Sequence, residues 1–209
     1  MSVPMNPANR VTILRMVFIP VFLVVMLGEI QPWVPAPGFW LTAQPWIAAV
    51  FFTILAATDA VDGYLARSRN EVTTFGKLID PLADKLLVTA ALVALVDLDA
   101  LPSWVALVII SREFIVTGLR MVAVAEGRVI AAGGYGKVKT VFQIIAIVMF
   151  IIKDSELIGE FASWAPTVFY FASWTVMSIA LVLTIYSMID YFYHARAVLT
   201  GPWRAEEPS

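Results

Sequence analysis

Four aspartates with helical spacing lie in one short segment of this chain. Asp59 and Asp62 are three residues apart, and Asp80 and Asp84 are four residues apart, so each pair occupies one face of a helix. Four clustered carboxylates repel one another and would not all stay ionised without a cation between them. Carboxylate oxygens suit Mg²⁺, Mn²⁺ or Ca²⁺ better than Zn²⁺. The segment therefore predicts a divalent-metal site.

Small residues accompany these aspartates at fixed positions. The segment reads Asp-x2-Asp-Gly-x2-Ala-Arg-x8-Gly-x3-Asp-x3-Asp from Asp59 to Asp84, and its small side chains let backbone or ligand approach closely. A solvated loop is the simpler interpretation of any single aspartate here. It does not explain why both pairs adjoin apolar runs. The complete pattern resembles the signature of the CDP-alcohol phosphotransferases.

This resemblance implies a fold, a cofactor and a set of roles. Members of the family hold two Mg²⁺ or Mn²⁺ ions, which on this chain implies Asp59, Asp62 and Asp80 as metal ligands. Asp84 then corresponds to the general base and is a further candidate metal ligand. The positions that would lie around the CDP nucleotide are Asp59, Asp62, Gly63, Ala66, Arg67 and Gly76.

The composition indicates a membrane protein that would position these residues on helices. The chain has 209 residues, 60% of them hydrophobic, and a mean hydropathy of +0.84, which is typical of the membrane class. A net charge of −2 gives no sign of the basic surface that nucleic-acid binding requires. The absence of cysteine excludes disulfides, thiolate metal sites and cysteine nucleophiles. We expect an all-α integral membrane protein with one catalytic domain at 1–200 and a disordered tail at 201–209.

Apolar runs predict six transmembrane helices, which is also the CDP-alcohol phosphotransferase fold. Their approximate ranges are 11–28, 46–67, 75–96, 103–124, 135–152 and 167–193. The first reads as a retained helix and not a cleaved signal peptide. Prolines in the linker at 29–45 are expected to block a helix there. Pro81 either begins the third helix or kinks it.

The basic residues predict the orientation in the membrane. All Lys and Arg except Lys153 and Arg112 fall on one side of the expected spans. Basic residues favour the cytoplasmic side, so both termini and the aspartate segment are expected at the cytoplasmic face. The resemblance places such a multi-pass protein in the bacterial inner membrane and implies a homodimer.

Four further basic residues are candidates for binding an acceptor phosphate: Arg112, Arg120, Lys137 and Lys139. Arg112 and Glu113 lie well inside the fourth expected span, where ionisable residues are functional candidates because burial there is expensive. A buried ion pair with other helices is an equally good interpretation. Two lysines at a cytoplasmic helix end are, taken alone, most often topology determinants. On a regular helix Lys137 and Lys139 diverge by about 160°, so they share one phosphate only if that segment is not helical.

Three short motifs point to one branch of the family. Asn9-x-x-Thr12-x-x-Arg15, Ser111-Arg112-Glu113 and Gly136-Lys137-x-Lys139-Thr140 resemble the phosphatidylglycerophosphate synthases. These enzymes transfer the phosphatidyl group of CDP-diacylglycerol to sn-glycerol 3-phosphate and release CMP.

Two rival interpretations stay open on the sequence. Inositol phosphate, serine or phosphatidylglycerol could be the acceptor, since the aspartate motif does not distinguish among them. A divalent-cation transporter is a remote alternative, because transporter sites lie near the midplane between repeated halves. Here the carboxylates fall at one membrane face and no repeat is visible.

Overall fold

The protein is described by a computed structural model. It describes residues 7–28, 38–69, 74–125 and 135–199, with side chains at 14–28, 38–58, 85–123 and 138–193. These residues form seven helices and no strand, which confirms the all-helical prediction. The helices are α1 (Pro7–Leu27), α2 (Gly38–Arg69), α3 (Thr74–Asp97), α4 (Ser103–Ala125), α5 (Tyr135–Ile152), α6 (Glu156–Phe161) and α7 (Ala165–Leu199).

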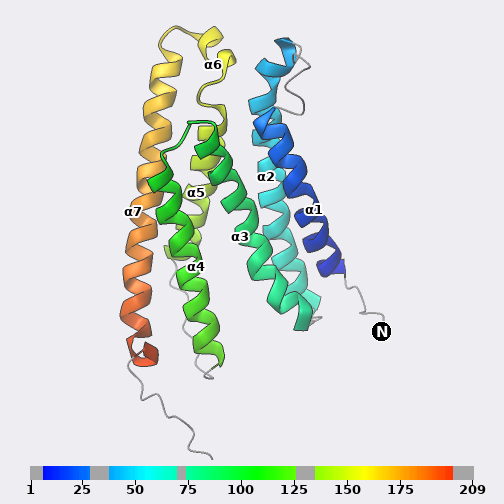
Figure 1. Ribbon diagram of the computed structural model, residues 1–209, viewed down its shortest axis with the longest axis vertical. Helices are drawn as coiled ribbons and strands as arrows, with labels where there is room; N and C mark the ends of the chain where they lie inside the picture. The colour runs from blue at the N-terminus through cyan, green and yellow to red at the C-terminus, as the bar shows by residue number, and fades with distance from the viewer. Residues whose placement is uncertain (1–6, 29–37, 70–73, 126–134, 200–209) are drawn as a thin grey trace, which may run out of the picture.

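The six long helices run side by side as a bundle, and the short α6 lies across one end (Figure 1). Contacts join α5 with α7, α1 with both α2 and α3, α2 with α5, and α4 with both α3 and α7. The third and fourth helices begin and end within two residues of the predicted ranges, and α5 has the predicted bounds. Since α3 begins at Thr74, Pro81 does not begin it.

The linker prediction at 29–45 was wrong over its second half. The helix α2 begins at Gly38 and contains Pro45. Proline lacks a backbone N–H, so it costs one helical hydrogen bond. The side chain of the preceding residue, Gln44, makes two hydrogen bonds that offset this loss. Its Nε2 donates to the carbonyls of Val25 and Met26 at 3.1 and 2.8 Å, which are among the orphan acceptors at the end of α1. The start of α2 is therefore fastened to the end of α1.

Gly28 ends α1 in a left-handed conformation, with φ +70°. Its N–H donates to the carbonyl of Val24 at 3.1 Å, as in common helix C-caps. A Cβ at this position would lie 2.5 Å from Gln44 Nε2. The backbone angle therefore favours glycine, and a Cβ here would displace the Gln44 amide from its hydrogen bonds to α1.

The apolar core fills the half of the bundle nearer α6. Its largest fully buried members come from α1, α2, α3, α4, α5 and α7, and they are Phe22, Phe52, Leu92, Leu95, Ile109, Ile147, Phe150 and Met177. The ring of Phe22 packs against that of Phe52 at 5.7 Å between centroids. Toward the other end, the buried side chains of α1, α4 and α5 become polar, with Arg15, Arg112, Lys139 and Gln143. The bundle therefore has an apolar half and a polar half.

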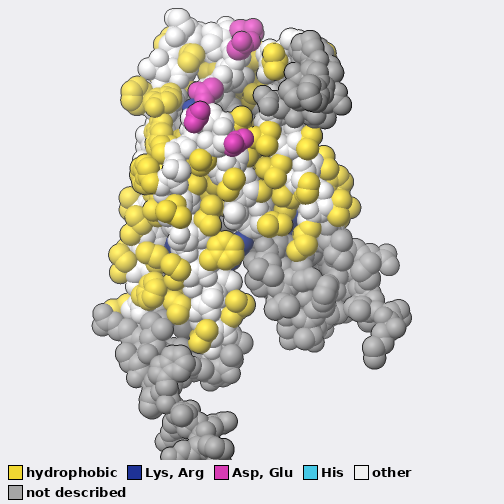
Figure 2. All heavy atoms as spheres, viewed as in Figure 1, with side chains coloured by type: hydrophobic (Ala, Val, Ile, Leu, Met, Phe, Trp, Pro, Cys, Tyr) yellow, Lys and Arg dark blue, Asp and Glu magenta, His cyan; other side chains and the backbone are white. Residues whose placement is uncertain are grey.

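The outside of the bundle is largely apolar. Figure 2 shows hydrophobic side chains over the described part of the visible face, where acidic side chains gather near the end that carries α6. Val182 and Phe171 on α7 are 66% and 65% exposed. Large exposed apolar surfaces mark membrane or protein contacts.

Among the described residues, two segments are long and apolar enough to cross a membrane, Gly38–Thr58 and Ala165–Tyr193. Leu14–Leu27 and Val138–Ile152 are shorter apolar segments. With 32 and 35 residues, α2 and α7 would extend about 48 and 52 Å, beyond a hydrocarbon core of about 30 Å. The count of six spans stays a prediction.

Candidate functional site

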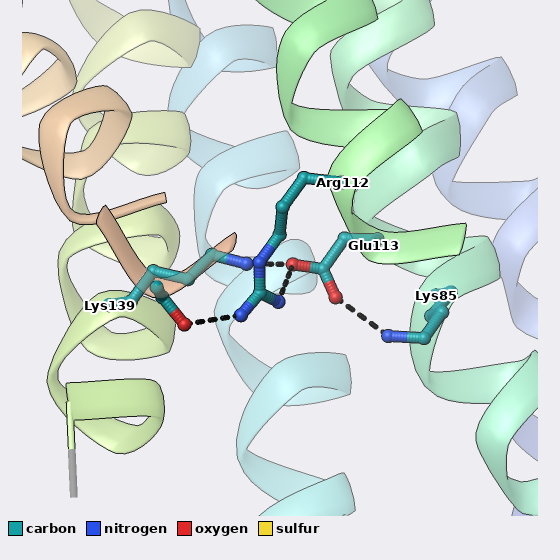
Figure 3. Close-up of polar contacts among 5 residues, drawn as sticks. Lys85, Arg112, Glu113 and Lys139 are labelled. Carbon is teal, nitrogen blue, oxygen red and sulfur yellow. Dashed lines mark hydrogen bonds and ion pairs between the residues drawn. The ribbon is translucent and has the colours of Figure 1, made fainter. Parts of the chain in front are cut away.

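A carboxylate and three basic side chains meet in the polar half of the bundle (Figure 3). Glu113 on α4 accepts from Lys85 on α3 at 2.6 Å through Oε2. Its Oε1 accepts from Arg112 Nη1 at 3.1 Å and also from Lys139 Nζ on α5. We call Lys85, Arg112, Glu113 and Lys139 the Glu113 cluster. One carboxylate therefore joins three helices.

Arg112 extends this network to a fourth helix. Its Nη2 donates to Ser187 Oγ on α7 at 2.6 Å. Its Nε is buried and has no hydrogen-bond partner within the described structure. A buried unsatisfied donor costs about 1–3 kcal/mol. A ligand atom that accepted from this N–H would therefore recover a cost that no described residue offsets.

The Glu113 cluster is shielded from solvent. The side chain of Lys139 is only 2% exposed, against 11% for Arg112, 15% for Glu113 and 18% for Lys85. Removing one partner of a buried ion pair typically costs 3–5 kcal/mol because it leaves a buried charge unpaired. The arrangement is therefore fixed by its charges as well as by the backbone.

A cavity of about 160 Å³ opens beside Glu113. Its polar lining comes from α1, α3, α4 and α5, with Arg15, Lys85, Glu113, Thr140 and Gln143, and its apolar lining is Ala56, Leu87, Val88 and Ile144. A cavity of this size accommodates a ligand of about six heavy atoms. The site therefore combines a small volume with basic and hydrogen-bonding groups.

The four aspartates fall on two helices that contact each other. Asp59 and Asp62 lie in the last third of α2, and Asp80 and Asp84 lie in the first half of α3. Their side chains lie outside the described residues, as do those of Gly63, Ala66, Arg67 and Gly76. Within the described part of the chain, no group of three or more His, Cys, Asp or Glu could hold a metal. The metal and nucleotide assignments therefore stay predictions.

Of the acceptor candidates, the structure brings Arg112 and Lys139 together on Glu113. Arg120 is exposed on the same helix as Arg112. The side chain of Lys137 lies outside the described residues, but α5 is helical from Tyr135. The condition under which Lys137 and Lys139 share one phosphate, a non-helical segment, is therefore not met. Lys139 and Arg112 therefore share Glu113, and the acceptor role of all four basic residues stays a prediction.

Sequence reasoning missed two polar residues of the cavity, Lys85 and Gln143, and named Arg15 only as part of a motif. Arg15 and Gln143 are only 3% and 5% exposed although they belong to apolar helices. Gln143 follows Lys139 by four residues, which places both on one face of α5. Lys85 follows Asp84 directly at the entry to an apolar run. Polar residues on apolar helices were the available signal. The four-residue spacing of Lys139 and Gln143 would have placed these two side chains on one face of α5.

A family model described as CDP-alcohol phosphatidyltransferase matches residues 5–192. The chain belongs to this family. The aspartate pattern, Arg112 and Lys139 all lie inside the matched range.

Three relatives are similar to this chain over most of their own length. A protein of Bacillus subtilis (strain 168), CDP-diacylglycerol–glycerol-3-phosphate 3-phosphatidyltransferase, is 42% identical over 179 residues, covering 78% of this chain and 89% of that protein. A probable phosphatidylglycerophosphate synthase of Mycobacterium tuberculosis is 35% identical, covering 94% of this chain and 84% of that protein. An Escherichia coli K12 protein with the same name as the Bacillus relative is 34% identical, covering 93% and 97%.

Proposed function

We propose that this CDP-alcohol phosphatidyltransferase transfers the phosphatidyl group of CDP-diacylglycerol to sn-glycerol 3-phosphate, giving phosphatidylglycerophosphate and CMP. The observation that carries the proposal is 42% identity, over 78% of the chain, to a relative named for this reaction. The buried cations of the site support it, because a phosphate-bearing acceptor needs such cations. Arg112 and Lys139 lie on Glu113, and the cavity beside Glu113 has Arg15 and Lys85 in its lining.

In the proposed reaction, the 1-hydroxyl oxygen of glycerol 3-phosphate attacks the β-phosphorus of the diphosphate. The new P–O bond forms as the bond to CMP breaks, and CMP leaves with the electron pair of that bond. We assign Asp84 as the general base that takes the hydroxyl proton, since a carboxylate in reach of the proton can do this at neutral pH.

The donor set fits a hard divalent cation. Two carboxylate pairs on the contacting helices α2 and α3 offer oxygen ligands, which Mg²⁺ and Mn²⁺ prefer. We assign Asp59, Asp62, Asp80 and Asp84 to hold two such ions. Bound there, they would offset the negative charge of the diphosphate and of the leaving group. Gly63, Ala66, Arg67 and Gly76, with Asp59 and Asp62, are assigned to the CDP moiety.

For the acceptor, we assign Arg112 and Lys139 as the primary phosphate ligands. Charge-assisted hydrogen bonds from Arg and Lys to phosphate are short and about twice as strong as neutral ones. Arg120 and Lys137 are assigned to the approach to the pocket, since Arg120 is exposed and Lys137 lies on the opposite face of the helix from Lys139.

The membrane setting is part of the proposal. We place the protein in the bacterial inner membrane, with the aspartate segment and both termini at the cytoplasmic face and the lipid tails of CDP-diacylglycerol in the bilayer. The end that carries α6 then faces away from the cytoplasm, as the distribution of basic residues along the sequence favours. We further propose a homodimer.

An acceptor panel tests the proposed function. The purified protein in detergent is supplied with CDP-diacylglycerol, Mg²⁺ and one acceptor at a time: glycerol 3-phosphate, inositol phosphate, serine or phosphatidylglycerol. CMP release is measured, with the Asp84→Asn variant as the background. Release that depends on glycerol 3-phosphate alone supports the proposal, and release that depends on another acceptor replaces it.

A further inference from the structure

The two oxygens of Glu113 have separate partners. Oε1 holds both proposed phosphate ligands, Arg112 and Lys139, whereas Oε2 holds Lys85 at 2.6 Å. Figure 3 shows Lys139 and Lys85 on opposite sides of the carboxylate. Oε1 of Glu113 therefore already pairs with the two cations that an acceptor phosphate needs.

A phosphate and Glu113 Oε1 compete for the same donors. Arg112 Nη1 is engaged with Glu113 and Nη2 with Ser187, so only its buried Nε lacks a partner among the described residues. The amine of Lys139 is nearly inaccessible to solvent. A carboxylate and a dianionic phosphate also repel each other when they share a site. Arg112 and Lys139 carry more N–H groups than these bonds use, so what a phosphate has to displace is the negative charge of Oε1 beside the two cations.

We propose that Glu113 is a specificity-determining residue, an internal anion that holds Arg112 and Lys139 until the acceptor's phosphate takes its place. The inference rests on the proposed function, since it concerns the same acceptor pocket. A neutral acceptor offers no charge with which to displace a carboxylate from two cations. A phosphate offers two charges and three acceptor oxygens. Lys85 keeps Glu113 in the site during the exchange, because its bond to Oε2 need not break.

Thermal unfolding with inorganic phosphate tests this exchange without any turnover. Glu113→Gln keeps the shape of the side chain and removes its charge. The parent and the variant are melted in detergent with increasing phosphate, at an ionic strength held constant with chloride. Without phosphate, the variant should unfold at a lower temperature than the parent, because its buried cations have lost their anion.

With phosphate, the variant should gain more stability than the parent. If phosphate binds tenfold more tightly once Glu113 no longer competes, the extra stabilisation is about 1.4 kcal/mol. For a chain of this size that corresponds to an additional rise of roughly 3–6 °C in the midpoint, at about 2–4 °C per kcal/mol. A gain no larger than that of the parent overturns the proposal.

Two further variants keep the test specific. Asp154→Asn removes the carboxylate partner of Lys153, the other described buried lysine, near α6, and should show the phosphate response of the parent. Adding Lys139→Met to Glu113→Gln should abolish the extra gain, and an extra gain that persists contradicts the exchange at Lys139. If Glu113→Gln does not fold, Glu113→Asp serves instead, because its shorter side chain withdraws from Arg112 and Lys139. A phosphate gain equal to that of the parent in this variant also overturns the proposal.

The acceptor panel on the parent protein separates the two hypotheses. No release of CMP with glycerol 3-phosphate, together with the extra phosphate gain in Glu113→Gln, removes the acceptor but retains the anion exchange. Release with glycerol 3-phosphate and no extra gain retains the proposed function and removes the role of Glu113.

Discussion

Lys139→Met is the sharpest test of the acceptor pocket. Methionine keeps the length of the side chain and removes its charge at a position that is 2% exposed. Glu113 still has Lys85 at 2.6 Å and Arg112 at 3.1 Å, so no carboxylate is left unpaired. The variant should therefore lose less than the 3–5 kcal/mol that follows when a buried charge loses all its partners.

The expected effect on binding follows from the same contacts. A hydrogen bond to a charged group contributes about 1.5–3 kcal/mol, or about 10- to 150-fold in affinity. Because the parent must first release Lys139 from Glu113, part of this free energy cancels, and the lower end of the range applies. We expect the apparent KM for glycerol 3-phosphate to rise about tenfold, with the KM for CDP-diacylglycerol unchanged.

The assay is CMP release in detergent, with one substrate varied while the other is saturating. The matched control is Lys153→Met, which removes the other buried lysine of the described structure, near α6. This control should leave both KM values at those of the parent. If the KM for glycerol 3-phosphate in Lys139→Met stays within about twofold of the parent, Lys139 is a structural or topology residue and the acceptor pocket lies elsewhere.

Three other predictions concern the metal ligands, the general base and the glycine that ends α1. CMP release should disappear, while the protein still inserts and purifies, when alanine replaces any one of Asp59, Asp62 and Asp80; near-normal release at saturating Mg²⁺ would refute the metal assignment. Asp84→Asn should bind CDP-diacylglycerol but lose at least the 100- to 10,000-fold that general base catalysis typically contributes, and a rate within about tenfold of the parent would mean that another group takes the proton. Gly28→Ala should lower the free energy of unfolding by about 1–2 kcal/mol, because of its left-handed backbone and the close approach of Gln44. Gly118→Ala, where a Cβ meets nothing within 4 Å, is the control in the same thermal unfolding assay and should be neutral or stabilising, and equal losses in both variants would contradict the argument.

Apolar runs predicted most of the helical segments, because a chain that crosses an apolar environment must satisfy its own backbone hydrogen bonds. The bounds of α5 and the approximate bounds of α3 and α4 followed from the sequence. The start of α2 at Gly38 did not, because the cost of Pro45 is local, whereas the hydrogen bonds of Gln44 to the end of α1 are tertiary. The short helix α6 lies between the fifth and sixth expected spans and was not predicted, because six residues carry too little pattern to be recognised.

The candidate site was predictable in its residue types but not in its pairing. Arg112 and Lys139 stood out as charges on apolar helices, and both lie in the site. Glu113 was read only as the neighbour of Arg112, because no sequence rule says that α3 and α5 bring Lys85 and Lys139 to the same carboxylate. That outcome depends on how three helices pack, which the spacing within each helix does not determine.

The division of the bundle into an apolar and a polar half has a consequence for altering the enzyme in the laboratory. Side chains such as Phe22 and Ile147 contact many neighbours with no directional bond, so exchanges of similar volume cost little. Around Glu113 the contacts are directional and charged, so an exchange at one residue alters the charge balance of its partners. Libraries aimed at a new acceptor should therefore vary the residues of the cavity in linked pairs, with the half near α6 left as an unaltered scaffold.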